Sequence, residues 1–295
     1  RGVEGGGGAD VGGRTGAGGP CRPGEEIDRA GGGRGRTGRG EAAAGDILRA
    51  FHEGEQSVVL WPGVSYGWAA AKQFGVPGAM AAAETAMIAR DIALALDTGA
   101  RVVFQHVSCG QSVALIRAGK ALGARVYAEV TPHHLSLTED DVPAHGTYAR
   151  MNPPLRRETD RQALIEGLRD GTIDMIATDH APHTEEEKAR EFAKAPSGIT
   201  GLETAFSVCN TYLVKTGRLT PMQLIDKMSK APAEIYGLTG RAVAEGNFAR
   251  LVLLDWENEI VYKTYKSKAI NTPYTNRPVT GAPGAIVTGT RLTMR

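Results

Sequence analysis

The sequence has few of the features that mark secreted, membrane-spanning or nucleic-acid-binding proteins. Its 295 residues include only three cysteines, Cys21, Cys109 and Cys209. Their odd number and wide spacing argue against a disulfide framework and fit a reducing cytosol. No apolar run reaches 18 residues and the first residues contain no apolar signal segment, so neither a membrane span nor a secretory signal is predicted. A formal net charge of +1 gives no general attraction to nucleic acid or anionic membranes. The sequence therefore predicts a cytoplasmic protein without nucleic-acid or membrane partners.

The first 40 residues differ in composition from the rest of the chain. They hold 17 of the 39 glycines and seven arginines, but no lysine and no aromatic residue. Such a segment buries too little apolar surface to offset its chain entropy, so residues 1–45 are predicted to be disordered. An Arg/Gly-rich RNA-binding tail is the functional alternative, which five acidic residues and the lack of stacking aromatics disfavour. A start read in the wrong frame, a fragment or a processed chain is the third interpretation, since the first residue is Arg1.

From about residue 69 the chain alternates between short β-branched runs and stretches with helical spacing of apolar residues. This order predicts a parallel α/β sheet or barrel. The predicted strands are 101–106, 125–130 and 173–178, and the predicted helices are 80–96, 112–122, 159–170, 202–215 and a last one from 220. Glycines are expected to end three of these helices, at Gly99, Gly123 and Gly171.

Two helix starts carry capping patterns, and the C-terminal region changes texture. Thr159 with Gln162 is expected to form a capping box, and Thr220 is expected to cap a helix that has Pro221 at its first position. After Gly246 the helical pattern stops, and residues 250–255 and 285–291 are predicted strands. The predicted organisation is a barrel-like domain over 46–245 and a C-terminal β segment over 246–295.

Polar residues follow several of the predicted strands. Parallel α/β barrels carry their functional groups at the C-terminal ends of strands. Taken singly, a histidine after a strand is usually a packed core residue, and an aspartate at a helix start is usually a cap. Their clustering at successive strand ends favours a site instead, because imidazole and carboxylate groups bind divalent metals such as zinc. The residues concerned are His106, Asn152, Asp179, His180 and His183.

Several short motifs resemble those of class I dihydroorotases, in the same order and without a large gap from about residue 69 to 291. They are HVS (106–108), AEVTPHHLSLT (128–138), NPPLR (152–156), ATDHAPHTEEEK (177–188), APSGITGLETA (195–205) and NTPY (271–274). The resemblance implies a (β/α)8 TIM barrel with a small β domain built from both chain ends. Of this barrel the chain would hold about the last three or four strand-helix units. The implied reaction is the reversible cyclisation of N-carbamoyl-L-aspartate to L-dihydroorotate in pyrimidine biosynthesis, catalysed at a binuclear zinc site.

The resemblance also implies roles for individual residues. His106 corresponds to a zinc ligand, and Asp179 to a carboxylate that contacts zinc and acts as general base and acid. Asn152 and His183 correspond to substrate-binding positions. Ser197 and Gly198 lie in a loop whose backbone contacts the substrate in the family, with Ser197 in place of the usual phenylalanine. The histidines of TPHH, at 133 and 134, are expected to be structural.

The chain departs from the family at the remaining metal ligands. It contains no His-x-His, no matching arginine that would bind the substrate carboxylate, and no counterpart of the bridging aspartate. An alignment on HEGE (52–55) places Arg39 where a further ligand histidine would fall. His52 is either a substitute ligand or an exposed polar residue, and the second interpretation is preferred. The zinc ligand set is therefore expected to be incomplete and the chain inactive alone.

Three functions stay open at this point. The first is a truncated or frame-shifted dihydroorotase, and the second is a non-catalytic homologue that scaffolds aspartate transcarbamoylase. The third is another cyclic amidohydrolase, such as a hydantoinase or allantoinase. The expected partners are a small-molecule substrate and either further copies of the chain or aspartate transcarbamoylase.

Overall fold

A computed structural model describes residues 47–50, 68–75, 78–238 and 243–294 of the chain. All of them belong to one compact unit, Ala42–Arg295. The predicted disorder of the N-terminal segment and the assignments at Arg39 and His52 lie outside the described residues. Among the helices that are described, none is both long and apolar enough to cross a bilayer.

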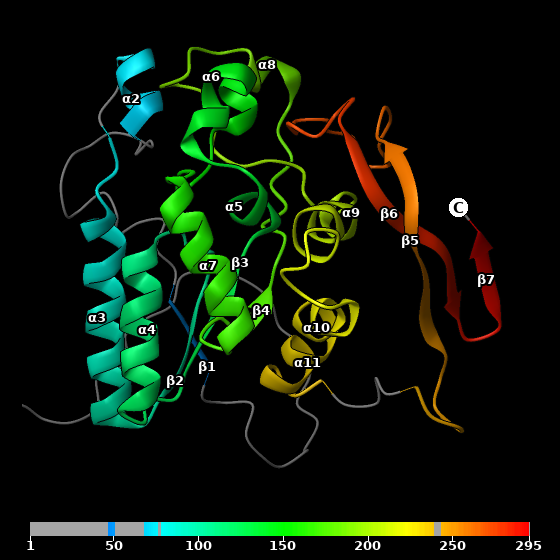
Figure 1. Cartoon of the computed structure of the whole chain (residues 1–295), viewed down its shortest axis with the longest axis horizontal. Helices are drawn as coiled ribbons and strands as arrows, with labels where there is room; N and C mark the ends of the chain where they lie inside the picture. The colour runs from blue at the N-terminus through cyan, green and yellow to red at the C-terminus, as the bar shows by residue number, and fades with distance from the viewer. Residues whose placement is uncertain (1–46, 51–67, 76–77, 239–242, 295) are drawn as a thin grey trace, which may run out of the picture. The chain divides into compact units, whose positions relative to one another are not determined.

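Four parallel strands form the central sheet, in the order β1-β2-β3-β4 (Figure 1). Helix α3 packs against β2 and α4 packs against β3, while α3, α4 and α7 lie side by side. The bounds are β1 Ile47–Ala50, β2 Arg101–Phe104, β3 Val126–Val130, β4 Met175–Ile176, α3 Ala81–Thr98, α4 Gly110–Ala121 and α7 Glu158–Asp170. This confirms the α/β class with a parallel sheet.

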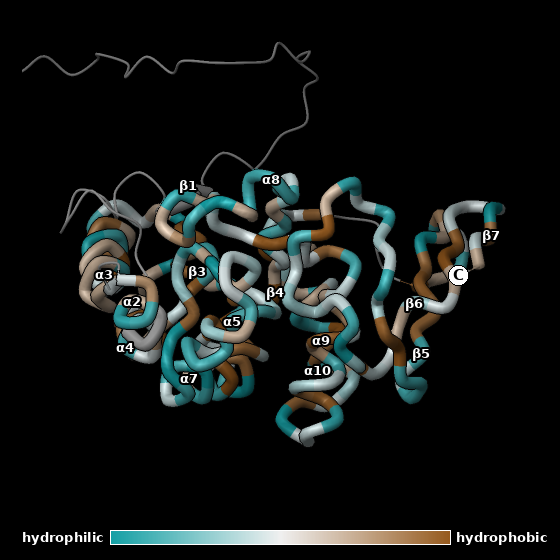
Figure 2. The backbone as a smooth tube through the Cα atoms, turned by 90° about the horizontal axis from the view of Figure 1, so that it is seen from above, coloured by the Kyte–Doolittle hydropathy of each residue, from teal (hydrophilic) through white to brown (hydrophobic). Residues whose placement is uncertain are grey.

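Helices α3 and α4 approach closely at a glycine. Gly119 on α4 lies so close to Ile92 on α3 that a Cβ there would stand 2.9 Å from the Ile92 side chain. The close approach lets both helices bury apolar faces over the sheet, where the main core includes Phe104, Ile116 and Val130. Hydrophobic stretches, brown in Figure 2, run along β4, α9 and the C-terminal sheet, whereas the tube around α7 is largely teal.

Shorter elements cover the rest of the barrel-like region. They are α2 Trp68–Phe74, α5 Pro132–Ser136, η1 Glu139–Asp141, α6 Val142–His145, η2 Gly146–Ala149, α8 Glu185–Lys188, α9 Ala205–Cys209, η3 Asn210–Val214, α10 Pro221–Ile225, η4 Asp226–Lys230 and α11 Ala231–Ile235. Both η3 and η4 are π-helical turns. The predicted helix over 202–215 is therefore a short α-helix followed by a wider turn.

Several predicted element boundaries are wrong for identifiable reasons. Arg157, not Thr159, is the N-cap of α7. The side-chain oxygen of Gln162, which a capping box would use as an acceptor, accepts from Arg218 instead. The strand predicted over 173–178 is shorter in the structure, where β4 spans only 175–176, and a left-handed backbone conformation follows at Asp179. By contrast, the capping box of Thr220 with Gln223 is confirmed.

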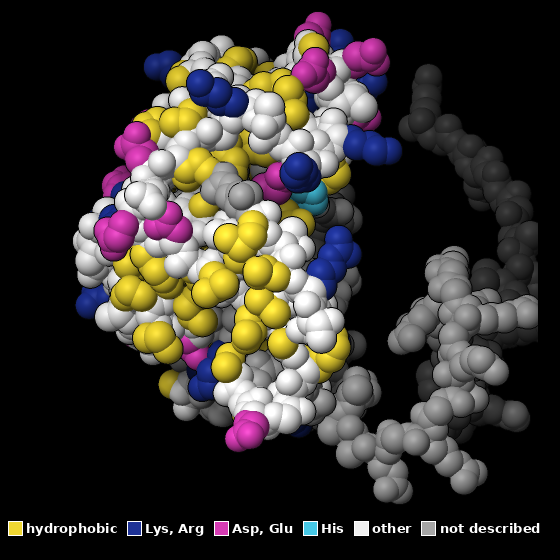
Figure 3. Space-filling view, turned by 90° about the vertical axis from the view of Figure 1, so that its right-hand side faces the viewer, with side chains coloured by type: hydrophobic (Ala, Val, Ile, Leu, Met, Phe, Trp, Pro, Cys, Tyr) yellow, Lys and Arg dark blue, Asp and Glu magenta, His cyan; other side chains and the backbone are white. Residues whose placement is uncertain are grey.

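The C-terminal strands form a separate antiparallel sheet. Its strands are β5 Arg250–Val261, β6 Pro278–Thr288 and β7 Arg291–Met294. The strand predicted over 250–255 is therefore longer in the structure, and the one predicted over 285–291 is divided between the end of β6 and the start of β7. Helix α9 packs against β6. Large apolar side chains of the sheet are exposed, and hydrophobic patches are visible on this side of the molecule (Figure 3). Those side chains include Leu251, Val252, Leu253, Ile286, Leu292 and Met294.

Candidate active site

His106 and Asp179 lie at the same end of the parallel sheet. His106 is two residues beyond the end of β2, and Asp179 is three residues beyond the end of β4, with β3 between the two strands. Both have a positive φ, of 41° and 47°. This left-handed conformation is uncommon for residues other than glycine, and such backbone strain is often found at functional sites. The two predicted metal-binding residues therefore share an unusual local geometry at the C-terminal edge of the sheet.

The loop that follows β4 is bonded to a second loop that contains Ser197 and Gly198. The amide of Ala181 donates to the carbonyl of Ile199 at 2.8 Å, and Nε2 of His183 donates to the carbonyl of Ser197 at 2.9 Å. That second bond places the proton of a neutral His183 on Nε2, because a carbonyl oxygen can only accept. The structure thus brings three of the predicted substrate-binding residues, His183, Ser197 and Gly198, into one pair of loops.

A glycine is required where these two loops meet. Gly198 has a φ of +104°, and a Cβ at this position would lie 2.5 Å from the Cβ of Ala181. No larger residue fits without separating the loops. The amide of Gly198 also donates to the carbonyl of Arg150 at 2.8 Å, two residues before Asn152. The fourth predicted substrate-binding residue therefore belongs to a segment tied to the same loops.

The histidines of TPHH are buried in α5, and one of them, His134, connects it to the segment of Asn152. Nε2 of His134 donates to the carbonyl of Pro153 at 3.1 Å, and its Nδ1 accepts from the hydroxyl of Thr131 at 2.8 Å. Burial lowers the pKa of His134 to about 4, and burial also lowers the pKa of His133, with neighbouring His134 and His106 adding to it. Both imidazoles are therefore neutral near pH 7. The contacts of His134 and the burial of both residues agree with the structural role expected from the sequence.

Glu84 is a buried residue that the sequence analysis missed. Its carboxylate accepts from the amide of Ser108 at 3.1 Å, from the hydroxyl of Ser112 at 2.6 Å and from the hydroxyl of Ser108. Nη2 of Arg156 lies 4.0 Å away, and Arg156 also donates to the Ser108 hydroxyl at 3.2 Å. Glu84 thereby links the loop after His106 to NPPLR. One signal in the sequence was available: Glu84 lies three and four residues before the apolar Met87 and Ile88, which places it on the same helix face.

Opposing effects act on the ionisation of Glu84. Burial favours the neutral carboxyl, but the Arg156 guanidinium and the hydrogen bonds from Ser108 and Ser112 outweigh it, so the pKa of Glu84 is lowered. The carboxylate is therefore charged at neutral pH. Its neighbour Cys109 has a pKa raised to about 12 by burial and by the Glu84 charge, which keeps that thiol protonated.

The residues that the structure describes do not by themselves fit a binuclear metal centre. Within these residues, no three His, Cys, Asp or Glu side chains lie close enough together to bind a metal ion. A catalytic zinc usually takes three protein ligands. His106 and Asp179 alone are fewer than that, so a complete centre would need ligands from outside the described residues.

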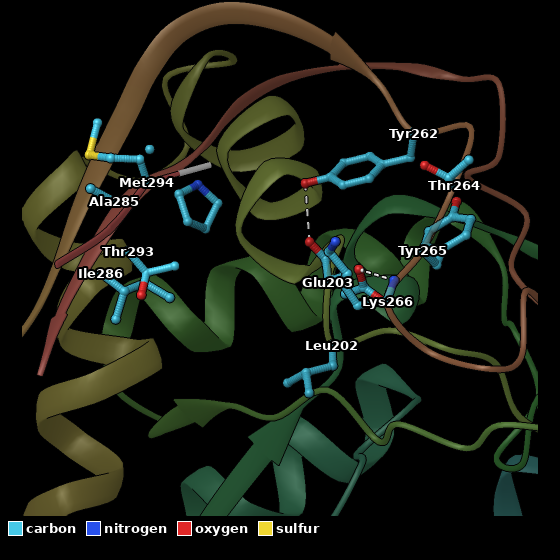
Figure 4. A pocket seen from close by; sticks show the side chains of 12 residues that line it. Leu202, Glu203, Tyr262, Thr264, Tyr265, Lys266, Ala285, Ile286, Thr293 and Met294 are labelled. Atoms are coloured by element: carbon cyan, nitrogen blue, oxygen red, sulfur yellow. Dashed lines mark hydrogen bonds between the residues drawn. The ribbon is translucent and has the colours of Figure 1, made fainter. Parts of the chain in front are cut away.

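A cavity of about 500 Å³ lies elsewhere, between the loop at Leu202 and the C-terminal sheet (Figure 4). None of the predicted site residues lines it. Inside it, the Glu203 carboxylate accepts from the amides of Lys266 and Ser267 at 2.9 Å, and the Tyr262 hydroxyl donates to the Glu203 carbonyl at 3.1 Å. The Glu203 carboxylate thus anchors the chain that returns from β5.

Comparison with known proteins identifies the family. The family model of the amidohydrolases matches residues 69–288. This chain belongs to the amidohydrolase family. Metal dependence is typical of that family.

Individual relatives are consistent with this assignment. The chain is 50% identical over 236 residues to a dihydroorotase from Clostridioides difficile, and 47% identical over 237 residues to one from Lactococcus lactis. Each match covers 80% of this chain and 56% of the relative, so the chain spans little more than half the length of these curated relatives.

Among solved structures, the L-hydantoinase from Arthrobacter aurescens matches with a TM-score of 0.66 and 29% identity, covering 72% of this chain and 49% of that one. A D-hydantoinase from a Thermus species matches with a TM-score of 0.67 and 27% identity, over 73% and 49%. The likeness supports a fold of the TIM-barrel type for the family region.

Proposed function

We propose that this chain is the C-terminal part of a dihydroorotase, an enzyme that interconverts L-dihydroorotate and N-carbamoyl-L-aspartate. The observation that carries the proposal is the 44–50% identity to curated dihydroorotases over 80% of the chain. Identity to the solved hydantoinases is only 24–29%. In this interpretation the four-stranded parallel sheet is the last three or four strand-helix units of an eight-stranded barrel.

The proposed residue roles follow the positions at the sheet edge. Asp179 would act as general base and acid: it accepts a proton from the water that attacks the ring amide carbon, and then passes it to the leaving nitrogen as the C–N bond breaks. Asn152, His183 and the Ser197–Gly198 backbone would bind the substrate. His106 and Asp179 would contribute two metal ligands to a set that needs others.

Two alternatives have weaker support. A hydantoinase activity is favoured by the structural likeness, but the sequence identity to those enzymes is lower. A scaffold for aspartate transcarbamoylase would not need strained backbone at His106 and Asp179. An assembly with that enzyme, or of several copies of this chain, stays a prediction that size measurements on the purified protein would test.

Turnover assays test the proposed activity. The chain alone, supplied with zinc, is expected to show no detectable turnover of L-dihydroorotate, because a productive metal site needs several ligands in a set geometry. Joining it to an upstream segment that carries His-x-His-x-Arg should restore turnover. In that joined protein Asp179→Asn should abolish activity, whereas Asp140→Asn, at an exposed position, should not.

Specific results would contradict the proposal. Faster turnover of hydantoin or allantoin than of dihydroorotate by the joined protein would favour the third interpretation. Zinc-dependent turnover by the chain alone would show that the account of missing ligands is wrong, and His52 would be the first residue to substitute. Full activity in Asp179→Asn would remove Asp179 from its proposed role.

A further inference from the structure

Asn271 of the NTPY motif makes a set of contacts for which sequence analysis assigned no role. Its side chain is 1% exposed. Nδ2 donates to the carbonyl of Ala181 at 3.0 Å and to that of Gly198 at 3.2 Å, while Oδ1 accepts from the amide of His183 at 3.0 Å. One side chain therefore bonds both loops that carry the proposed substrate-binding residues. Its backbone carbonyl adds a fourth contact, from the amide of Thr200 at 3.0 Å.

The segment that carries Asn271 is anchored on both sides. Upstream, the Glu203 carboxylate holds the amides of Lys266 and Ser267 (Figure 4). Downstream, the hydroxyl of buried Tyr274 lies 2.6 Å from that of Ser136 in α5. Because the segment is fixed independently of the two loops, the Asn271 amide has a defined place from which to hold them.

We propose that Asn271 is a positioning residue, which fixes His183 and Gly198 relative to each other and so sets the shape of the substrate-binding loops. The identity of the substrate rests on the proposed function. The hydrogen bonds by which Asn271 holds the two loops do not depend on it. Only a carboxamide fits the three contacts, because it offers two N–H donors and an acceptor together. A carboxylate would turn an oxygen toward two carbonyl oxygens, and an apolar side chain would leave all three backbone groups unpaired.

A neighbouring residue provides a matched control. Thr272 is also buried, at 2% exposure, and its hydroxyl has no hydrogen-bond partner among the described residues. Thr272→Val removes a buried polar atom at the next position without breaking a contact. It therefore reports on the disturbance caused by any substitution in this segment.

Hydrogen–deuterium exchange of the full chain tests whether Asn271 holds the two loops together. In Asn271→Asp, exchange should accelerate about tenfold in peptides covering 179–184 and 196–201, which is the scale of one lost hydrogen-bond contact. Peptides from α4 should be unchanged, and Thr272→Val should match the unaltered chain throughout. Asn271→Ser, which leaves room for water, should give a smaller change in the same peptides and serves if the aspartate variant does not fold.

Two exchange results would overturn the proposal: unchanged exchange in both loops, or equal acceleration in α4, which would make Asn271 merely a contributor to global stability. Calorimetric titration with L-dihydroorotate, carried out on the protein joined to the upstream His-x-His-x-Arg segment, adds a separate readout, with affinity expected to fall about tenfold in Asn271→Asp. Wild-type affinity in a variant with loosened loops would also overturn the positioning role. Failure of the unaltered joined protein to bind dihydroorotate would count against the proposed substrate, while the exchange result would still decide whether Asn271 holds the two loops.

Discussion

Replacing Glu84 by glutamine is expected to destabilise the chain strongly, although the two side chains have nearly the same shape. The carboxylate faces donors on both oxygens, from Ser108 and Ser112, with Arg156 nearby. A glutamine can keep its oxygen toward the backbone amide only by turning its NH2 group toward the guanidinium. The charge of Arg156, whose side chain is 10% exposed, would then lack its counter-ion.

The magnitude follows from the cost of leaving a buried charge unpaired. Removing one partner of a buried ion pair typically costs about 3–5 kcal/mol. In this pair Nη2 of Arg156 is 4.0 Å from the Glu84 carboxylate, and Arg156 keeps its 2.6 Å hydrogen bond to the Ala79 carbonyl in the variant. We therefore expect Glu84→Gln to lower the unfolding free energy by about 3 kcal/mol, near the lower limit of that range. A typical domain has a total stability of only about 5–15 kcal/mol, so the loss would be large.

Urea denaturation followed by circular dichroism would measure this loss, with an exposed pair as control. Glu166→Gln breaks an ion pair with Arg169 whose side chains are both more than half exposed, and should change stability by less than about 0.5 kcal/mol. Arg156→Met in the Glu84→Gln background should recover part of the loss, because the unpaired charge is removed. A Glu84→Gln variant within about 0.5 kcal/mol of wild type would refute the argument.

The same carboxylate gives an acid-sensitive contribution to stability. Its pKa is lowered in the folded state, so the unfolded chain binds the proton more readily as the pH falls below about 4.5. The contribution is complete above the unfolded pKa and is lost as the pH falls through the folded one. Unfolding free energy should therefore fall more steeply with acid in wild type than in Glu84→Gln.

Further predictions concern strain, pH and one buried hydroxyl. Gly198→Ala should lower the unfolding free energy by about 3 kcal/mol or more, and Gly171→Ala by only about 1–2 kcal/mol, because both positions have positive φ but only the first adds a clash. Equal losses of stability in thermal denaturation would contradict this. Burial lowers the pKa of Lys188 to about 8, so wild-type stability should rise relative to Lys188→Met between pH 8 and 10.5, and a flat difference would be evidence against it. Tyr274→Phe should cost about 1 kcal/mol in urea denaturation, since Ser136 keeps its 2.8 Å bond to the Pro132 carbonyl, and no loss would show that the Tyr274 hydroxyl bond contributes nothing.

The order of strands and helices could be predicted from the sequence because apolar periodicity and glycine stops are local signals. Gly99 and Gly171 end their helices in the left-handed conformation, as their positions predicted. The start of α7 could not be predicted in this way. Its capping pattern competes with the contact of Gln162 to Glu158, and Gln162 also accepts from distant Arg218. Such competition depends on tertiary neighbours that a sequence window does not contain.

The candidate site could also be predicted from the sequence only in part. The strand-end positions of His106 and Asp179 follow from the alternating pattern and the geometry of parallel sheets. The residues that hold the site, Glu84 and Asn271, could not be predicted from the pattern. One lies in an alanine-rich helix and the other follows β5, and their partners are 24 to 90 residues away in the chain. Only the fold shows that these polar groups are buried together.

These long-range contacts connect the motifs to one another. His134 bonds Pro153, Glu84 bonds Ser108 near Arg156, and Asn271 bonds the loops of His183 and Gly198. A buried polar group that loses its partner costs far more than an exposed one, so each contact resists substitution whether or not it touches substrate. The geometry at the sheet edge therefore depends on residues from α3 to the segment beyond β5. A substitution at Glu84 or Asn271 should alter the site without changing any residue proposed to bind substrate.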